Sequence, residues 1–331
     1  MGPIVMEIES LRALTCVALR MGGMLCESDA LIIADHLLDS ELRGLEQGGV
    51  RRAIAVAKRL EKGHLTETIK ITGETISSAL VDGGGNPGYL VGHKATTIAV
   101  QKASISGLAM VAATNTWVTG MLSYYAEMAT RENLVFVGFA SSAWRVAPFG
   151  GSQPRFGTNP ICIGFPSRGV PVIVDTATSA VAVGQVLQQL QEGRPLDENC
   201  AFDADGQPTT DPAKALAGAL NAWGGARGAA LAMAVQLIGL LAGGPVEPDP
   251  ENDASLTIIV ASPGLFGSTT EYAGKVEAYS DIIRRTRTAG APPRMPFERS
   301  AALRRDRLAL GKVPVSAATC AELERLSRGS S

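Results

Sequence analysis

Histidines, cysteine pairs and long apolar runs are scarce in this chain, and each scarcity excludes a kind of site. The 331 residues include three histidines and five cysteines, and no two cysteines form a Cys-x-x-Cys pair. The cysteine spacing therefore indicates neither a disulfide framework nor a zinc site. Unpaired, scattered cysteines are typical of a reducing compartment, and no basic segment followed by an apolar one opens the sequence. We therefore expect a cytoplasmic protein.

Neither charge nor apolar sequence is concentrated enough to indicate a polyanion or a bilayer as partner. Lysines and arginines number 30 against 32 acidic residues, a formal charge of −2, so we expect no binding to nucleic acid or to an anionic membrane surface. The most apolar run, 229–243, contains Gln236 and is too short to span a bilayer. We interpret it as a buried helix. The length predicts a large core and about two domains.

Helices are predicted at both ends of the chain, and helices alternate with strands in the middle. Two helices are expected within 10–44 and a third over 50–62, after which the apolar spacing changes to strand-like alternation from Thr68. Further helices are predicted at 91–104, 121–131, 179–191, 213–220, 226–241 and 270–288, and strands at 108–113, 134–140, 161–165, 172–174 and 256–261. The tail is predicted to be basic and helical.

Polar side chains gather at the ends of two predicted strands in the stretch 150–184. Thr158 and Asn159 precede the strand at 161–165, and Asp175, Thr176 and Thr178 follow the strand at 172–174. Backbone N–H groups at a strand-to-helix turn bind phosphate or carboxylate. Because most such turns bind nothing, capping of a helix that begins at Ser179 explains the same residues, and capping and ligand binding can coexist.

Four motifs carry a resemblance to one family: GTNP at 157–160, VDTATSAVAVG at 174–184, DADGQPTTDP at 203–212 and GGARG at 224–228. In this order and spacing they resemble the malate/L-lactate dehydrogenase-like oxidoreductases. That family includes sulfolactate, ureidoglycolate and diketogulonate enzymes and the reductases of piperideine- and pyrroline-carboxylate. The resemblance covers nearly the whole chain.

The resemblance implies an α/β fold without a Rossmann domain, and no GxGxxG motif follows a strand here. A central mixed-sheet domain would bind the cofactor, and an all-helical domain would be built from both chain ends. We accordingly expect a discontinuous helical domain at 1–67 and 289–331 and a central α/β domain at 68–288. The family is typically dimeric, which implies a homodimer.

The stretch ELRGLEQGGVRR at 41–52 departs from the family pattern, which reads approximately D-L-R-G-H-x-S-H-G-V-x-R. The second histidine of that pattern donates a proton to the substrate carbonyl; Gly48 occupies its place here, and Leu45 occupies that of the first. Arg52 stands where the resemblance implies an arginine that clamps the substrate carboxylate, which a guanidinium does through two parallel hydrogen bonds. Without the resemblance, Arg52 reads as a surface arginine beside Arg51.

The stretch NTWVTGMLSYY at 115–125 lacks a second family histidine. The family reads N-S-x-H-F-G-x-x-x-Y, so Val118 replaces the histidine, whereas Gly120 and Tyr124 follow the pattern. Trp117 either stacks on a substrate ring or the nicotinamide, or is a buried aromatic residue at a strand end, and the sequence leaves both open. Structural or surface roles are expected for the remaining histidines, His36, His64 and His93.

The absence of both histidines bears on the reaction. Reducing a ketone requires a proton for the oxygen, and loss of that general acid costs about 10²- to 10⁴-fold in rate. An iminium already carries its proton and its positive charge, so hydride can add without a general acid. The sequence therefore favours a C=N substrate with a carboxylate, although related imine reductases generally keep their histidines. Tyr124, Tyr125 and Glu46 are the candidates for a substitute acid.

The resemblance also places nucleotide contacts along the chain. They fall on Asp175, Thr176, Thr178 and Ser179, on Ala226 and Arg227, and on Phe297, Glu298 and Arg299, with Asn159 nearby. Arg227 replaces the family lysine and keeps a charge that holds phosphate. Phe297 replaces a glycine that lets backbone approach a ligand closely, which is expected to alter cofactor fit. The aspartates of 203–212 lack EF-hand spacing, so we predict a structured turn and no metal site.

The sequence thus predicts an NAD(P)H-dependent oxidoreductase that reduces the C=N bond of a small carboxylated substrate, such as a cyclic imino acid. NADH and NADPH both remain open as cofactor. The expected catalytic residues are Arg52, Trp117 and Tyr124. One alternative is a 2-oxo acid/2-hydroxy acid dehydrogenase with a relocated proton donor. Another is a non-redox protein or pseudoenzyme on the same scaffold.

Overall fold

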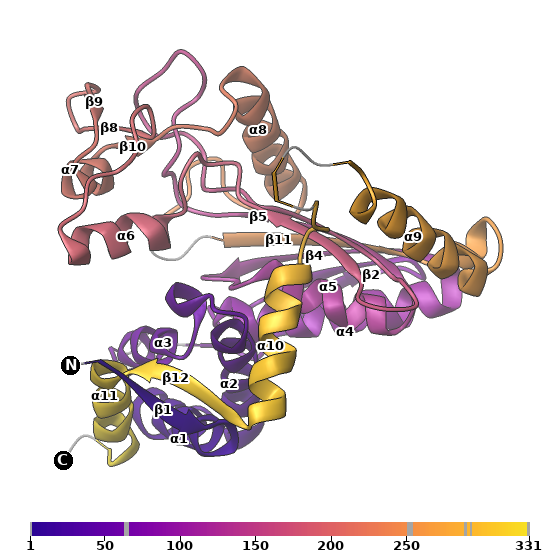
Figure 1. Cartoon of the computed structure of the whole chain (residues 1–331), viewed down its shortest axis with the longest axis horizontal. Helices are drawn as coiled ribbons and strands as arrows, with labels where there is room; N and C mark the ends of the chain where they lie inside the picture. Colours follow the sequence, from indigo (N-terminus) through magenta and orange to yellow (C-terminus); the bar gives the residue numbers. More distant parts are fainter. Residues whose placement is uncertain (1, 63–65, 250–253, 288–289, 292, 330–331) are drawn as a thin grey trace. The chain divides into compact units, whose positions relative to one another are not determined.

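A computed structural model describes residues 2–62, 66–249, 254–287, 290–291 and 293–329 (Figure 1). The chain forms two compact units, described separately below: a terminal unit of Met1–Glu67, Phe165–Ile173 and Phe266–Ser331, and a central unit of Thr68–Gly164 and Val174–Leu265. The domain division predicted from the sequence, 1–67 with 289–331 and 68–288, stays a prediction. Helix α9 (Thr269–Arg284) belongs to the terminal unit, in which its Glu277 accepts hydrogen bonds from Ser167 Oγ at 2.6 Å and from the Gly169 N–H at 3.0 Å.

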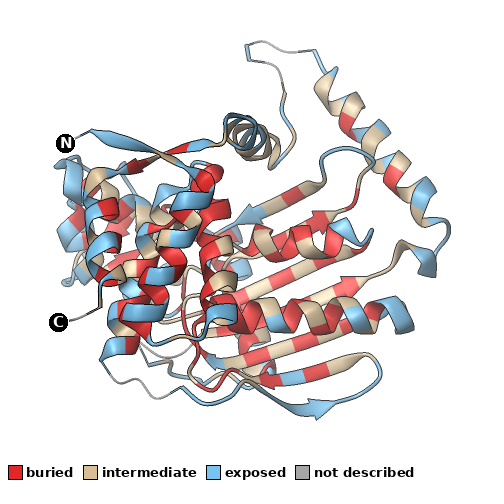
Figure 2. Ribbon diagram, turned by 90° about the horizontal axis from the view of Figure 1, so that it is seen from below, coloured by how far each residue is buried: buried red, intermediate tan, exposed pale blue. Residues whose placement is uncertain are grey.

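The central unit is organised on a seven-stranded sheet of order β2-β3-β4-β11-β5-β6-β7. The strands are β2 (Lys70–Glu74), β3 (Ser78–Asp82), β4 (Leu108–Thr116), β5 (Val135–Ser141), β6 (Ile161–Phe165), β7 (Val172–Thr176) and β11 (Ala254–Ala261). Strands β3 and β4 are parallel, whereas β11 is antiparallel to both β4 and β5, so the sheet is mixed as predicted. Buried residues alternate along the strands (Figure 2), as expected where side chains point to opposite faces.

Helices cover both faces of this sheet. Helices α4 (Gly88–Ser106) and α5 (Leu122–Arg131) lie on one face, and α8 (Ala226–Leu241) lies on the other (Figure 1). Small residues make the packing close: an added Cβ at Gly92 of α4 would lie 2.5 Å from the Tyr125 ring, and one at Gly239 of α8 would lie 2.4 Å from Ser141 Oγ. Within the described residues, no helix is both apolar enough and long enough to cross a membrane.

A small lobe of the central unit combines a three-stranded sheet with two helices. It contains β8 (Ala201–Phe202), β9 (Pro208–Thr209), β10 (Ala219–Leu220), α6 (Val183–Glu192) and α7 (Pro212–Ala217). Its core includes Val146, Phe156, Val186, Leu196 and Leu220. The turn predicted at 203–212 is confirmed, because Asp203 Oδ1 accepts two backbone N–H groups and Asp211 caps α7.

Two predicted boundaries in this lobe are wrong. The helix predicted at 213–220 ends at Ala217, and Ala219–Leu220 form β10. Helix α6 begins at Val183, not at Ser179. The segment around Ser179 is instead extended and pairs with the segment around Ala222, and the Ala180 N–H donates to the Asn221 carbonyl at 2.7 Å. Pairing with residues some forty positions away overrides the local helical pattern. A strand-to-helix turn therefore does not occur directly at Ser179.

The terminal unit is mainly helical, as predicted. It contains α1 (Ile8–Gly23), α2 (Glu27–Leu42), α3 (Arg51–Glu61), α9, α10 (Glu298–Leu310) and α11 (Ala317–Ser327). The sequence analysis missed its two-stranded antiparallel sheet, in which β1 (Pro3–Glu7) pairs with β12 (Lys312–Ser316) and joins the two ends of the chain (Figure 1). This pairing joins the two chain ends together with the packing of α11 against α1.

Candidate functional site

Arg52, the predicted carboxylate clamp, is the second residue of α3 and directly follows the loop that precedes this helix. A short 3₁₀ turn, η1 (Glu46–Gly48), connects α2 to this loop. The Arg52 Nε donates to the Gln47 carbonyl at 2.9 Å, and the Arg52 N–H donates to the Gly49 carbonyl at 2.9 Å. Arg52 is half-buried, and among the described residues no carboxylate pairs with its guanidinium. Its terminal nitrogens are therefore available to an anionic ligand.

Glycines occupy the part of this loop where the family has its proton donor. An added Cβ at Gly48 would come within 4 Å only of the Ser40 side chain, with its Oγ 3.9 Å away. At Gly49 an added Cβ would lie 1.9 Å from Glu41 Oε2, so a side chain at this position would require the Glu41 carboxylate to move. Burial raises the pKa of Glu41 to about 7, and the hydrogen bond from the Val50 N–H partly offsets this rise.

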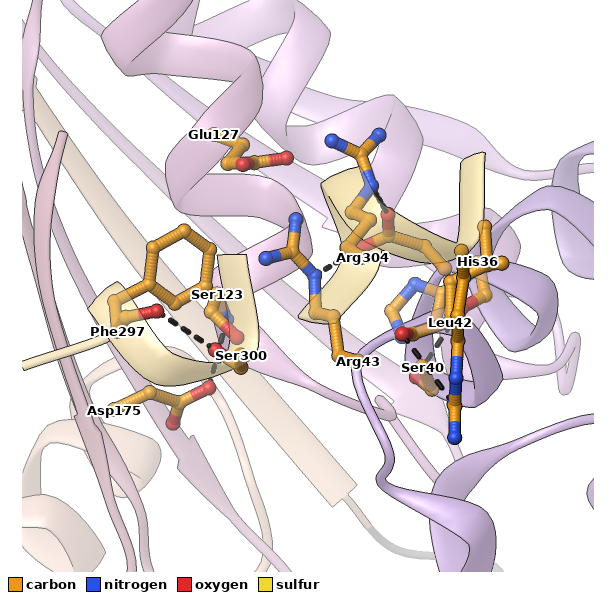
Figure 3. A network of polar contacts seen from close by, with 12 residues as sticks. His36, Ser40, Leu42, Arg43, Ser123, Glu127, Asp175, Phe297, Ser300 and Arg304 are labelled. Atoms are coloured by element: carbon orange, nitrogen blue, oxygen red, sulfur yellow. Dashed lines mark hydrogen bonds and ion pairs between the residues drawn. The ribbon is translucent and has the colours of Figure 1, made fainter. Parts of the chain in front are cut away.

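A buried ion-pair cluster joins α2 to the start of α10. Arg43 Nε donates to Asp39 Oδ2 at 2.6 Å, and both side chains are almost completely buried. Arg304 of α10 also pairs with Asp39. The Arg43 guanidinium lies 4.3 Å from the centre of the Phe297 ring, a cation–π contact (Figure 3). The Phe297 ring is therefore turned towards Arg43 within the terminal unit.

Phe297 has a left-handed backbone, with φ = 72°, at the position where the family has glycine. A non-glycine residue in this conformation costs about 1–2 kcal/mol. We therefore expect Phe297→Gly to be more stable than Phe297→Ala by about 1 kcal/mol, because both variants lose the ring but only glycine loses the strain. Urea unfolding of the two variants measures the difference. Equal midpoints would contradict a strained backbone at this position.

The two residues that follow Phe297 have different environments. Glu298 is committed to local structure, because its Oε1 pairs with Arg284 at 3.0 Å and its Oε2 accepts the Met295 N–H at 3.0 Å. Arg299 is exposed and has no partner among the described residues. Of this predicted nucleotide motif, Arg299 is the residue whose charge is available to a ligand.

At the end of β7, two of the predicted cofactor residues are accessible. Asp175 is exposed, and its Oδ2 accepts the backbone N–H of Ser123 at the start of α5, at 2.8 Å (Figure 3). Thr176 is also exposed, and its hydroxyl donates to the Ala177 carbonyl at 3.1 Å. The structure thus adds Ser123, which the sequence analysis missed, to this part of the central unit.

Thr178 and Asn159 hold the GTNP turn against α8 and are themselves buried. The Thr178 hydroxyl donates to the carbonyls of Thr158 and Asn159 at 3.0 and 3.1 Å. The Asn159 amide donates to the Ala232 carbonyl at 2.8 Å and to Gln236 Oε1 at 3.1 Å. These bonds give both side chains a shaping role, and direct contact with a cofactor stays a prediction. Ser179 is also buried, and its Oγ has no partner within the described part of the chain.

The start of α8 carries the features of an anion site. Gly224 and Gly225 both have left-handed φ values, 63° and 62°, and an added Cβ at Gly228 would lie 1.8 Å from the Trp223 carbonyl oxygen. The free N–H groups of the first helical turn favour phosphate, and the exposed Arg227 adds a charge with no partner among the described residues.

An open pocket of about 710 Å³ adjoins the start of α8. Its walls come from the segment 147–152, from the small lobe at 198–202 and from the segment 221–225, and they include Phe149, Cys200, Phe202 and Trp223. The pocket is large enough for a drug-sized ligand. The sequence analysis identified GGARG but not the aromatic residues around it, which come from segments far apart in the chain.

Trp117 and Tyr125 lie in the core of the central unit. The Trp117 indole N–H donates to the Gly85 carbonyl at 2.9 Å, and Trp117 is 7% exposed. This position favours the interpretation as a buried aromatic residue, and contact with the nicotinamide stays a prediction. The Tyr125 hydroxyl donates to the Thr119 carbonyl at 2.7 Å, and burial raises its pKa well above the ordinary value. Tyr125 is therefore poorly suited to donate a proton.

Of the remaining candidates near this segment, Tyr124 is half-buried and stands edge-on to Tyr125, with ring centres 5.8 Å apart. Val118, at the place of the second family histidine, has φ = 42°, which is an outlier for a β-branched residue and marks local strain. His36 is buried in α2, His93 lies in α4, and His64 is outside the described residues.

Comparison with known proteins connects this chain to one family over most of its length. The family model described as malate/L-lactate dehydrogenase matches residues 6–324. The L-sulfolactate dehydrogenase of Methanocaldococcus jannaschii is 33% identical over 273 residues, which cover 80% of this chain and 79% of that protein. The Delta(1)-pyrroline-2-carboxylate reductase 1 of Burkholderia ambifaria is 33% identical over 242 residues, covering 72% and 71%. A solved dehydrogenase structure from Sinorhizobium meliloti matches with a TM-score of 0.89, 31% identity and 98% of both chains covered.

Proposed function

The chain belongs to the malate/L-lactate dehydrogenase family of oxidoreductases, and on that premise we propose that it reduces the C=N bond of a small carboxylated substrate with NADH or NADPH. The observation that carries the proposal is the loop at 46–52. It presents Arg52 with terminal nitrogens available to an anion, and it has glycine in place of the family's proton donor. Such a segment can bind a carboxylate but lacks the histidine that would protonate an alkoxide.

The reaction needs no acid if the substrate nitrogen is already protonated. The carbon next to the carboxylate accepts the hydride, and the π-electron pair of the C=N bond passes to the nitrogen, which becomes a neutral amine. The nicotinamide supplies the hydride when it is bound. Arg52 holds the carboxylate and orients the carbon, so the protein contributes mainly positioning and electrostatics. A relative that is a pyrroline-2-carboxylate reductase supports this substrate class.

The residues at the start of α8 fit a nucleotide cofactor. The glycines at 224 and 225 leave the backbone open to close approach, and Arg227 is an exposed cation at a helix N-terminus. Arg299 and the accessible β7 end with Asp175 and Thr176 are the further proposed contacts. In this proposal Glu298, Asn159, Thr178 and Ser179 act by shaping the site, because their side chains are buried or committed to internal bonds.

A substrate panel tests the proposal. NADH or NADPH consumption is followed with cyclic 2-imino acids, such as Δ1-pyrroline-2-carboxylate, and with 2-oxo acids, such as pyruvate and oxaloacetate. We expect kcat/KM to be at least about 100-fold higher for the imino acids, the size of effect that a missing general acid has on ketone reduction. Equal or higher values for the 2-oxo acids would contradict a C=N substrate.

A 2-oxo acid/2-hydroxy acid dehydrogenase is the second candidate. The L-sulfolactate dehydrogenase relative, which covers 80% of this chain, favours it. That reaction requires a relocated proton donor, for which exposed Glu46 and half-buried Tyr124 are the remaining candidates. A required acid would appear as a fall of kcat/KM for the 2-oxo acid as pH rises through its pKa.

We also propose a homodimer, on the basis of the outer face of α8. One face of this helix packs on the sheet through small residues, but the other exposes large apolar side chains: Leu231, Met233, Leu237 and Leu241 are 40%, 49%, 57% and 74% exposed. Arg227 is the helix's one charged residue, so a two-fold contact between two such faces meets no like-charge repulsion along the ridge.

Leu237→Glu is therefore expected to dissociate the dimer. The change removes two buried leucines from a two-fold interface and places two carboxylates there, which is expected to raise the dimer Kd by more than about 100-fold. Sedimentation velocity measures the shift. The control is Leu310→Glu, the same change at a leucine that is 73% exposed at the end of α10. A wild-type protein that is monomeric at tens of micromolar would contradict the proposal.

A further inference from the structure

A buried carboxylate contacts the loop that precedes Arg52. Glu41 is on the last turn of α2 and is 4% exposed, and its Oε2 accepts the Val50 N–H at 3.0 Å. An added Cβ at Gly49 would lie 1.9 Å from the same oxygen, although Gly49 has φ = −84°, which any residue adopts. A side chain at 49 would therefore displace the carboxylate, whereas the φ value of this residue would tolerate it.

The bonds that follow lead from this carboxylate to Arg52. Val50 immediately precedes α3, the Gly49 carbonyl accepts the Arg52 N–H, and the Gln47 carbonyl accepts the Arg52 Nε, both at 2.9 Å. The position of the loop therefore sets the direction of the guanidinium. We propose that Glu41 is a positioning residue that anchors the loop 46–50 and thereby holds Arg52 in place for the substrate carboxylate. This inference rests on the proposed function.

The surroundings of Glu41 distinguish it from a purely stabilising acid. Asp39, on the same helix, forms ion pairs with Arg43 and Arg304. Among the described residues, by contrast, the Glu41 carboxylate pairs with no cation: Arg307 donates to the backbone carbonyl of Glu41 at 2.5 Å, and the direct partner of the carboxylate is the Val50 N–H. The hydrogen bond from the Val50 N–H is thus the direct contact that compensates for burial of this carboxylate, and it connects Glu41 to the loop.

Kinetics of three variants test the role. Glu41→Ala removes the acceptor, and we expect the KM for the carboxylated substrate to rise about 10- to 100-fold while kcat changes much less, because a hydrogen bond to a charged group is lost and the clamp is displaced. Glu41→Gln keeps an acceptor oxygen and is expected to recover most of the loss. Thr15→Val is the control, since it removes another buried hydrogen bond of the terminal unit, from Thr15 Oγ1 to the Leu11 carbonyl at 2.8 Å. An unchanged KM in Glu41→Ala, or an equal rise in the control, would overturn the proposal.

A second readout needs no substrate and separates this inference from the proposed function. Amide hydrogen exchange of residues 46–52 is expected to be at least about tenfold faster in Glu41→Ala than in the wild type, and unchanged in Thr15→Val. Gly49→Ala alone should produce the same acceleration, because its methyl group displaces the carboxylate. In a Glu41→Ala background the methyl group has room and should add little, so the two changes are non-additive. Unaltered exchange in Glu41→Ala, or strictly additive changes, would overturn the anchoring role even if no carboxylated substrate were turned over.

Discussion

Arg52→Ala is expected to lower kcat/KM for a carboxylated substrate by about 30- to 1,000-fold, equivalent to about 2–4 kcal/mol of lost binding to the charged group. Most of the loss should appear as a higher KM, because the carboxylate is bound in the ground state as well as in the transition state. Arg52→Lys should recover only part of it, since an ammonium cannot form two parallel hydrogen bonds with one carboxylate.

The control for this prediction is Arg51→Ala, which removes an exposed arginine from the adjacent position of the same helical turn. Its kinetics should stay within about twofold of the wild type, since a solvent-exposed charge is screened by water and salt. Steady-state kinetics on the best substrate of the panel measure both variants. If Arg52→Ala and Arg51→Ala behaved alike, Arg52 would not be the carboxylate clamp, and the substrate class would have to be reconsidered.

The largest stability effect is expected from Asp39→Ala, which should lower the free energy of unfolding by about 3–5 kcal/mol. Asp39 Oδ2 accepts from Arg43 Nε at 2.6 Å, and the exposed fractions of the two side chains are 7% and 0%. Without Asp39 the Arg43 guanidinium stays buried and loses its carboxylate, and Arg304 of α10 loses its partner on α2. Urea unfolding measures the change.

Asp35→Ala is a matched control on the same helix, one turn earlier. Asp35 forms an ion pair of the same geometry with Arg12, also at 2.6 Å, but the side chains are 38% and 37% exposed. An exposed pair contributes at most about 1 kcal/mol. If Asp35→Ala and Asp39→Ala shifted the unfolding midpoint equally, burial of the Asp39 cluster would not be what stabilises the junction of α2 and α10.

Local patterns in the sequence predicted the elements whose periodicity is strong. Strand β6 and helix α8 have the predicted bounds. A short apolar run bounded by turn residues and a long apolar helix can both be recognised from the local sequence alone. The pairing of β1 with β12 was missed, since it joins two five-residue segments from opposite ends of the chain. The extended conformation at Ser179 depends on the segment around Ala222, which no window around Ser179 contains.

Only those residues of the candidate site that lie in recognisable motifs could be predicted from the sequence. The motifs identified Arg52, Arg227 and Arg299 as ligand contacts, which stays a prediction; the side chain of Arg52 is half-buried and those of the other two are exposed. They did not reveal that the Asn159 amide donates a hydrogen bond to α8, because the two partners are 73 positions apart in the sequence. Nor did they reveal Glu41, although it stands inside the ELRG motif, because only the fold shows that its carboxylate meets the Val50 N–H.

Titration with NADH and with NADPH tests the central claim most directly, since the proposed reduction requires a nicotinamide cofactor. We predict saturable enhancement of nicotinamide fluorescence with at least one of them, at micromolar concentration. Arg227→Ala should weaken the binding at least about tenfold through loss of a charge at a phosphate site, and Arg194→Ala, an exposed arginine of the small lobe, should not. No binding of either cofactor at millimolar concentration would contradict the account and would favour a non-redox protein on this scaffold.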